Sequence, residues 1–269
     1  MIKVIGKEMQ LDLIRRVNEL DATYRRLGVS YGLVGAMPYH TPVAWIEHGR
    51  KTKWRYGVEF EINLAEIVLG ETQSLWANGL EYVCRVISHI LYLRLADYEG
   101  GITKDNSIPN GVEVVLVPMT RKEIIAHLEA VMNDRHIRPF LMEEENAALH
   151  VTVDPFETIE QQRAFYRFWN DDRFFHDFAG IAGREENGYI KQRKKPHYNK
   201  EGWMKADTID DHYYRCCIRE NGAMEVRVFK AFYDKKKIKA QLDLVHQVNQ
   251  LVRNAVSGYS TIKRLLHSH

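Results

Sequence analysis

The pattern of hydrophobic and polar positions predicts five helices. In each of them apolar residues recur at intervals of three or four, which places them on one face of a helix. The predicted helices cover residues 9–27 and 76–98, a segment opening at Thr120, a segment opening at Asp154, and residues 236–256. Capping patterns mark two of these starts, because Glu123 follows Thr120 at the third position and Pro155 follows Asp154 directly.

Seven further segments alternate apolar and polar residues, as strands do. They cover residues 31–34, 43–47, 54–63, 112–117, 148–153, 212–219 and 224–229. Most of them are half polar, which favours an antiparallel sheet with one face in solvent over a buried parallel sheet. We therefore predict an α+β fold, with helices backing a curved antiparallel sheet, in a single domain over residues 1–269.

Composition narrows the possible partners and compartment. The 269 residues are 45% hydrophobic and 28% charged, and 38 basic residues against 36 acidic ones give a net charge of +2. That balance makes nucleic acid an improbable main partner, and no apolar stretch approaches the roughly 18 residues of a membrane span. Three cysteines at positions 84, 216 and 217 build no disulfide framework, and the first residues show no apolar signal core. These features predict a cytoplasmic protein without a membrane partner.

One charged region departs from the alternating pattern. Residues 183–211 are poor in aliphatic side chains, and the stretch 191–205 holds six lysines or arginines against one acid, Glu201. Most such runs are solvated surface loops, but long structureless loops in compact domains are often functional. A surface loop and a flap over an anionic ligand are therefore both open.

Three glutamates are candidates for metal binding. Glu59 and Glu61 lie one strand repeat apart, about 7 Å, on the face opposite Val58 and Phe60. Taken alone, they fit an exposed strand face. Glu113 stands at the head of an otherwise apolar strand and needs either a basic partner or a divalent cation. A set of carboxylate oxygens suits Mg²⁺ or Mn²⁺ better than zinc.

Two other strands carry further polar side chains. His150 and Thr152 share one strand face, although a single histidine in a strand is more often structural than a ligand. Glu225 and Arg227 share a face after an Asn-Gly hairpin turn, which alone fits a solvated charge pair. Arginine is nonetheless well suited to bind phosphate or carboxylate groups.

The order of these motifs resembles the amidoligase family, relatives of glutamate–cysteine ligase and glutamine synthetase. The matching segments, within residues 55–250, are Gly-Val-Glu-Phe-Glu at 57–61, an Asp-Asn-Ser turn at 105–107, Gly-Val-Glu at 111–113, Leu-His-Val-Thr-Val at 149–153, and Glu-Val-Arg-Val-Phe at 225–229. The chain departs from the family pattern at Asn106, where glycine is usual, at Thr152, where a second histidine is common, and at Lys230-Ala231-Phe232, where a Gly-Thr pair is common.

The resemblance implies a funnel of antiparallel strands, backed by helices, that binds ATP and metal ions. Carried over by position, it assigns Mg²⁺ or Mn²⁺ binding to Glu59, Glu61 and Glu113. It assigns nucleotide contacts to His150, Arg215 and Arg227. It assigns catalytic roles to Arg227, Glu225 and Arg184, and leaves Thr152 without a role.

The implied reaction joins a carboxylate to an amine. The γ-phosphoryl group of ATP passes to a small-molecule or peptide carboxylate, and an amine displaces phosphate from the acyl phosphate to give an amide. A closed 183–211 flap would exclude water from that intermediate. Cys216 and Cys217 are expected to be structural, because neighbouring strand residues face opposite ways. Two alternatives are a phosphotransferase of the same broad fold and a non-catalytic protein that binds polyanions through residues 191–205.

Overall fold

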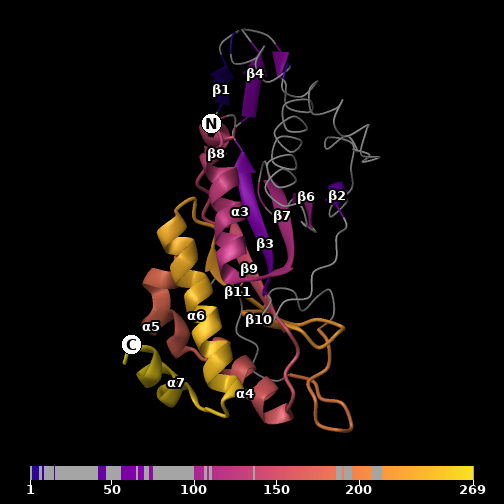
Figure 1. The fold of residues 1–269 in the computed structure, drawn as a ribbon, viewed down its shortest axis with the longest axis vertical. Coiled ribbons are helices and arrows are strands. Elements are labelled where there is room, and N and C mark those ends of the chain that lie inside the picture. Colours follow the sequence, from indigo (N-terminus) through magenta and orange to yellow (C-terminus); the bar gives the residue numbers. More distant parts are fainter. Residues whose placement is uncertain are drawn as a thin grey trace. The chain divides into compact units, whose positions relative to one another are not determined.

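The computed structural model describes a mixed α/β fold with an open antiparallel sheet, and five α-helices lie within the described residues (Figure 1). The described residues are 2–5, 8, 15, 42–46, 56–64, 66–69, 73–74, 100–105, 108, 111–135, 137–185, 190, 196–207 and 214–268. The chain divides into two compact units, one of residues 1–52 and 59–147 and the other of residues 53–58 and 148–269. The predicted α+β class is confirmed at this level, and the single domain stays a prediction.

The first unit contains two groups of strands. The strands β2 (Pro42–Ile46), β6 (Gly100–Asp105), β7 (Gly111–Met119) and β3 (Tyr56–Leu64) are neighbours in that order, and β8 (Leu141–Met142) pairs with the end of β3. The β2–β6 and β6–β7 pairs are antiparallel. A smaller sheet joins β1 (Ile2–Ile5) in parallel to β4 (Glu66–Leu69), which pairs antiparallel with β5 (Gln73–Ser74).

One helix of the first unit contacts strand β7. Helix α3 (Arg121–Asn133) begins at the predicted Thr120, whose side chain and that of Glu123 cap each other's backbone N–H groups. It buries Ile124, Leu128 and Val131, the stripe that its helical period predicts. A short 3₁₀ turn, η2 (Arg138–Phe140), follows it.

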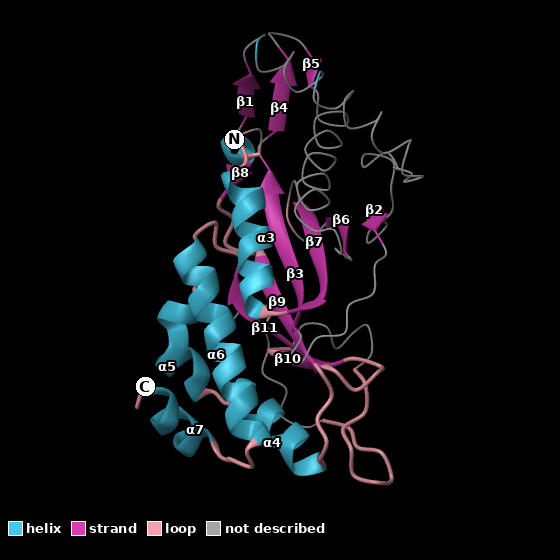
Figure 2. Cartoon of the chain, in the orientation of Figure 1, coloured by secondary structure: helices cyan, strands magenta, loops and turns pink. Residues whose placement is uncertain are grey.

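The second unit contains three strands and four helices, and three of these helices contact the strands (Figure 2). Strands β10 (Cys216–Ile218), β11 (Met224–Lys230) and β9 (Ala148–Val153) are antiparallel neighbours in that order. The helices are α4 (Ile159–Trp169), α5 (Arg173–Ala182), α6 (Lys235–Arg253) and α7 (Tyr259–Leu266). Helix α6 contacts β9 and each of the other three helices, so the helices of this unit pack around it.

Helix α6 begins after its cap, Asp234, close to the predicted start at residue 236. The Asp234 carboxylate accepts hydrogen bonds from two backbone N–H groups.

The core of the second unit is aromatic. Phe168 and Trp169 meet edge to face with ring centroids 5.1 Å apart, and Trp169 meets Phe229 of β11 at 5.7 Å. Such pairs bury large areas and favour these tilted geometries.

Two sequence predictions are corrected here. Helix α4 begins after Thr158, not at Asp154, because Thr158 and Gln161 form a complete reciprocal cap. The carbonyls of Asp154 and Pro155 instead accept from the Arg253 guanidinium. The predicted strand 212–219 is a strand only at residues 216–218 among the described residues.

Other elements lie beyond or outside the predictions. Strands β1, β4, β5, β6 and β8 and helices α5 and α7 were not predicted. The predicted helix 76–98, the strand 31–34, nearly all of the helix 9–27 and the basic residues 191–195 lie outside the described residues. None of the described helices has the length and apolar character needed to cross a membrane.

Candidate functional site

The first unit brings two of the predicted metal ligands together. Glu61 of β3 and Glu113 of β7 lie on neighbouring strands and each offers a carboxylate oxygen within 4.8 Å of the other. Both residues are buried, with 6% and 5% of their surface exposed. We call them the acidic pair. Glu59 is half-buried and precedes Glu61 by one strand repeat, on the same face.

The alternation of β3 explains why the acidic pair is held inside the protein. Phe60 and Ile62 are fully buried on the opposite face of β3, which fixes the strand and therefore the side to which Glu61 points. Val112 and Val114 fix Glu113 of β7 in the same way. The strand register is thus set by apolar burial, and the carboxylates follow from it.

The charge and geometry of the acidic pair fit a divalent cation. Two ionised carboxylates at this separation repel by about 3 kcal/mol at an effective dielectric constant of about 20. A Mg²⁺ ion with bonds of about 2.1 Å places two of its oxygen ligands about 3–4 Å apart. The 4.8 Å limit is compatible with that span after a small side-chain adjustment, and the donors are the hard oxygens that Mg²⁺ and Mn²⁺ prefer.

The second unit contains a cluster around Glu225, which we call the Glu225 cluster and which comprises His150, Arg219, Glu225 and Arg227. Glu225 is fully buried and accepts a hydrogen bond from Arg227 Nη1 at 2.5 Å. Arg219 forms a second ion pair with the other carboxylate oxygen. His150 Nδ1 lies 3.8 Å from Glu225 Oε1. One buried carboxylate is therefore held between two guanidinium groups.

The hairpin between β10 and β11 creates this cluster. Gly222 turns the chain with a φ of 83°, and the Arg219 N–H donates to the Ala223 carbonyl at 2.8 Å. Cys217 then faces Glu225 across the ladder, and Glu225 faces Thr152 of β9. Arg227 follows Glu225 by one strand repeat and so points to the same side. The predicted Asn-Gly turn and the shared face of Glu225 and Arg227 are both present.

Burial and positive charge keep His150 neutral. Desolvation lowers its pKa well below 6.5, and the nearby Arg227 guanidinium lowers it further, against the opposing effect of Glu225. A neutral imidazole can accept a hydrogen bond or ligate a metal. The structure thus leaves His150 in the protonation state that a ligand role needs.

Arg184 lies at the C-terminal end of α5. Gly183 ends that helix with a φ of 73°, and a Cβ there would come within 2.1 Å of the Phe232 ring. Glycine is therefore required at this position. The Arg184 side chain is buried, and its Nη1 lies 3.5 Å from the Phe229 carbonyl of β11. Its charge also contributes to lowering the pKa of His150.

Arg215 contacts the loop between α4 and α5. It is buried, its Nη1 donates to the Asp171 carbonyl at 3.0 Å, and its guanidinium lies over the Phe175 ring at 4.8 Å. These contacts tie β10 to the loop. The nucleotide contact assigned to Arg215 stays a prediction.

One member of the Glu225 cluster was missed from the sequence. Arg219 was not singled out as a site residue, yet it pairs with Glu225. The signal was present in the hairpin register, because Arg219 follows Cys217 by one strand repeat and Cys217 faces Glu225. Burial raises the pKa of the Cys217 thiol to about 12, and its structural role stays a prediction.

No model of a known protein family matches the chain, and no curated protein matches its sequence.

Proposed function

We propose that the chain is an ATP- and Mg²⁺-dependent carboxylate–amine ligase of glutamine-synthetase-like fold. The observation that carries the proposal is the acidic pair, two buried carboxylates within 4.8 Å of each other on adjacent strands. Two carboxylates at this separation concentrate negative charge that a divalent cation relieves. The order of motifs along the chain adds the amidoligase resemblance.

The acidic pair and Glu59 are the proposed metal ligands. When bound, Mg²⁺ supplies neutralisation of charge on the β- and γ-phosphate oxygens of ATP. Glu61 and Glu113 hold the cation through oxygen donors whose directions are set by the β3 and β7 register. The proposed reaction transfers the γ-phosphoryl group to a substrate carboxylate, and an amine then displaces phosphate to form the amide.

The Glu225 cluster is the proposed phosphate-binding element. Arg219 and Arg227 are partly exposed, at 33% and 17% of their side chains, while their shared anchor Glu225 is fully buried. Glu225 fixes the orientation of both guanidinium groups, and their positive charge stabilises charge on the transferred phosphoryl group. We propose that neutral His150 and Arg184 complete this element.

A screen for ADP release tests the proposal. Amino acids and amines are offered with ATP and Mg²⁺, and the active pair is assayed again with Glu113→Gln. We expect the variant to lose at least about 100-fold in turnover, in the range found when charge-stabilising groups are removed. The matched control is Glu143→Gln, an exposed glutamate of the same unit, which should keep turnover within twofold.

Product identity separates the ligase from the phosphotransferase. Mass spectrometry of the wild-type reaction should show an amide, free phosphate and ADP. A stable phosphorylated acceptor without amide would replace the ligase by a phosphotransferase. Full turnover in both Glu113→Gln and Glu61→Gln would refute the metal assignment for either enzyme.

A further inference from the structure

A groove in the second unit shares no lining residue with the Glu225 cluster. It has a volume of about 640 Å³ and is formed by helix α4, the loop after it and the segment 196–207. Volumes of this size are typical of small-molecule sites. Its lining includes Arg163, Arg167, Arg173 and Tyr198 together with two acids, Asp171 and Asp172.

Hydrogen bonds within the chain hold one wall of the groove in place. Residues 197–205 make a hairpin in which the Asn199 N–H donates to the Trp203 carbonyl at 2.8 Å. Two bonds hold this hairpin on α4: Arg163 Nη2 donates to the Gly202 carbonyl at 2.8 Å, and the Met204 N–H donates to the buried Gln162 side chain at 2.9 Å. A ligand would therefore meet a fixed wall and incur little ordering cost.

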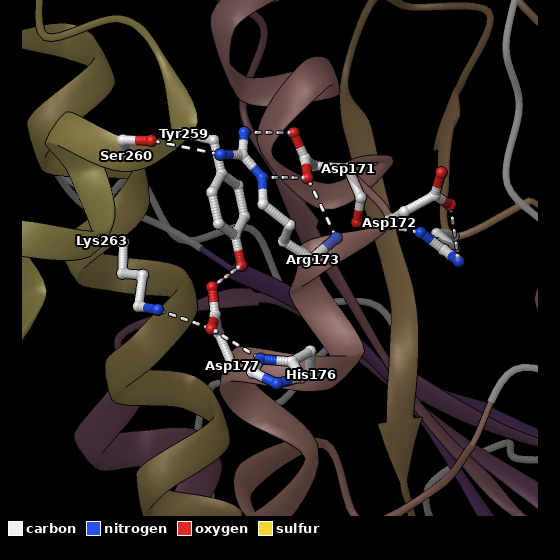
Figure 3. Close-up of polar contacts among 9 residues, drawn as sticks. Asp171, Asp172, Arg173, His176, Asp177, Tyr259, Ser260 and Lys263 are labelled. Carbon is white, nitrogen blue, oxygen red and sulfur yellow. Dashed lines mark hydrogen bonds and ion pairs between the residues drawn. The ribbon is translucent and has the colours of Figure 1, made fainter.

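Two arginines in the groove, Arg163 and Arg167, are not neutralised by an acidic side chain. The third, Arg173, forms a bidentate ion pair with Asp171, with distances of 2.8 and 2.9 Å; Figure 3 shows this pair. Arg163 and Arg167 make no ion pair with any residue that the structure describes. They stand four residues apart on α4 and so share one helix face. The buried Arg163 Nε–H also has no acceptor among the described residues.

An aromatic ring lies beside these arginines. The Arg163 guanidinium covers Tyr198, with Cζ 4.8 Å from the ring centroid, and 42% of Tyr198 remains exposed. An exposed tyrosine held by a stacked arginine is a platform on which a planar base can pack. Arg167 supplies a fork of donors for a phosphate, and Arg163 adds its Nη1, because its Nη2 donates to Gly202 and its Nε is buried.

We propose that this groove binds a nucleotide, with its phosphate at Arg163 and Arg167 and its base against Tyr198. The nucleotide is either free or one unit of a single strand, because both present the same phosphate and base. This inference is independent of the proposed ligase activity, since it uses neither the acidic pair nor the Glu225 cluster.

Calorimetric titration with AMP in EDTA tests the groove. EDTA removes divalent metal, so that metal-dependent ATP binding does not contribute. We expect Arg167→Gln and Tyr198→Ala, both exposed positions, to weaken AMP binding at least tenfold each. Arg264→Gln, an exposed arginine on α7 of the same unit, is the matched control and should bind within twofold of wild type.

Further titrations identify which parts of the nucleotide the groove recognises. Ribose 5-phosphate and adenosine should each bind at least tenfold more weakly than AMP, because each lacks one of the two groups. A ten-nucleotide single strand that binds tenfold tighter than AMP, with the same response to the variants, identifies a strand as the source. Equal affinity of the two identifies the free nucleotide.

Three outcomes would overturn the inference. One is the absence of AMP binding to the wild-type protein. Another is AMP binding that survives in Arg167→Gln and Tyr198→Ala but is lost in Arg227→Gln, which would place AMP at the Glu225 cluster. The third is ribose 5-phosphate binding as tightly as AMP, which would remove the base from the proposal.

Discussion

Buried carboxylates occur in both units of this protein, in opposite arrangements. In the first unit, Glu61 and Glu113 place two carboxylates within 4.8 Å of each other. In the second unit, Glu225 is buried between Arg219 and Arg227, so that the chain itself provides cations. Both arrangements sit on strands whose register is fixed by apolar neighbours. The difference lies in which charges the fold brings together.

The two arrangements differ in the charges that the fold places beside the buried carboxylates. The two guanidinium partners of Glu225 outweigh its one carboxylate, so the Glu225 cluster carries net positive charge. Two carboxylates brought together raise each other's cost of ionisation, and a divalent cation relieves that cost. Disrupting the Glu225 ion pairs should therefore lower the free energy of unfolding, whereas disrupting the acidic pair should remove the stabilisation by metal.

The largest stability effect is expected from Glu225→Gln. Removing one partner of a buried ion pair leaves uncompensated charge, which costs about 3–5 kcal/mol, and the partial exposure of Arg219 favours the lower end of that range. Urea unfolding should show the loss. Glu220→Gln, an exposed residue of the same hairpin, is the control. Equal midpoints for the two variants would contradict a structural role for the Glu225 ion pairs.

Magnesium should stabilise the wild-type protein through the acidic pair. At a Mg²⁺ concentration about 100 times the dissociation constant, binding to the folded state alone adds about 2.7 kcal/mol. Glu113→Gln should lose most of this increment, whereas Glu143→Gln should keep it. Thermal unfolding with and without Mg²⁺ measures the difference. An equal increment in wild type and Glu113→Gln would place the bound metal elsewhere.

Local patterns predicted the strands of the candidate site well. Strand β9 spans the predicted residues 148–153, and β3, β7 and β11 differ from their predictions by one or two residues at either end. The reason is physical: Phe60, Ile62 and Val114 are fully buried, so the apolar alternation that the sequence displays is the one that folding uses. The positions of Glu61 and Glu113 followed from that alternation.

Features that depend on contacts between distant segments were not predictable in the same way. The Asp154-Pro155 pattern resembles a helix start, yet the helix begins after Thr158, where Thr158 and Gln161 form a complete cap. Arg215 is in the same segment as Arg219, but its burial against Asp171 depends on packing of the α4–α5 loop. Strand β6 is rich in glycine, and its antiparallel pairing with β7 is not visible in its own side chains.

A further carboxylate, Asp177 on α5, has partners of its own (Figure 3), and its contribution to stability depends on pH. It accepts hydrogen bonds from Lys263 Nζ at 2.5 Å and from Tyr259 Oη at 2.9 Å. The Lys263 bond, more than any other contact, lowers the pKa of Asp177 to about 2. Asp177→Asn should cost about 1–2 kcal/mol at pH 7, a discounted value because Lys263 is exposed to solvent.

The pH dependence of this effect has a definite sign. As pH falls, the unfolded chain takes up a proton at Asp177 near pH 4, before the folded protein does near pH 2. The stabilisation is therefore complete above about pH 4 and is lost as the pH falls towards 2. Urea unfolding of wild type and Asp177→Asn should converge in that range, with Glu185→Gln as the exposed control. A difference that stays constant from pH 7 to about pH 2 would contradict this role.

The smallest effect is expected where solvent already screens the pair. Lys263 is 39% exposed, so Lys263→Met should cost about 0.2–1 kcal/mol and lose that cost in about 1 M salt. The control is Arg264→Met. Arg264 is an exposed neighbour of Lys263 that makes no ion pair with the described residues, so its loss should show no salt-dependent cost. The salt response separates Asp177 from Glu225: the Asp177–Lys263 pair is screened through its exposed lysine, whereas Glu225 keeps its arginine partners under the same salt. Equal salt responses of Lys263→Met and Glu225→Gln would mean that burial does not separate them, and the comparison would fail.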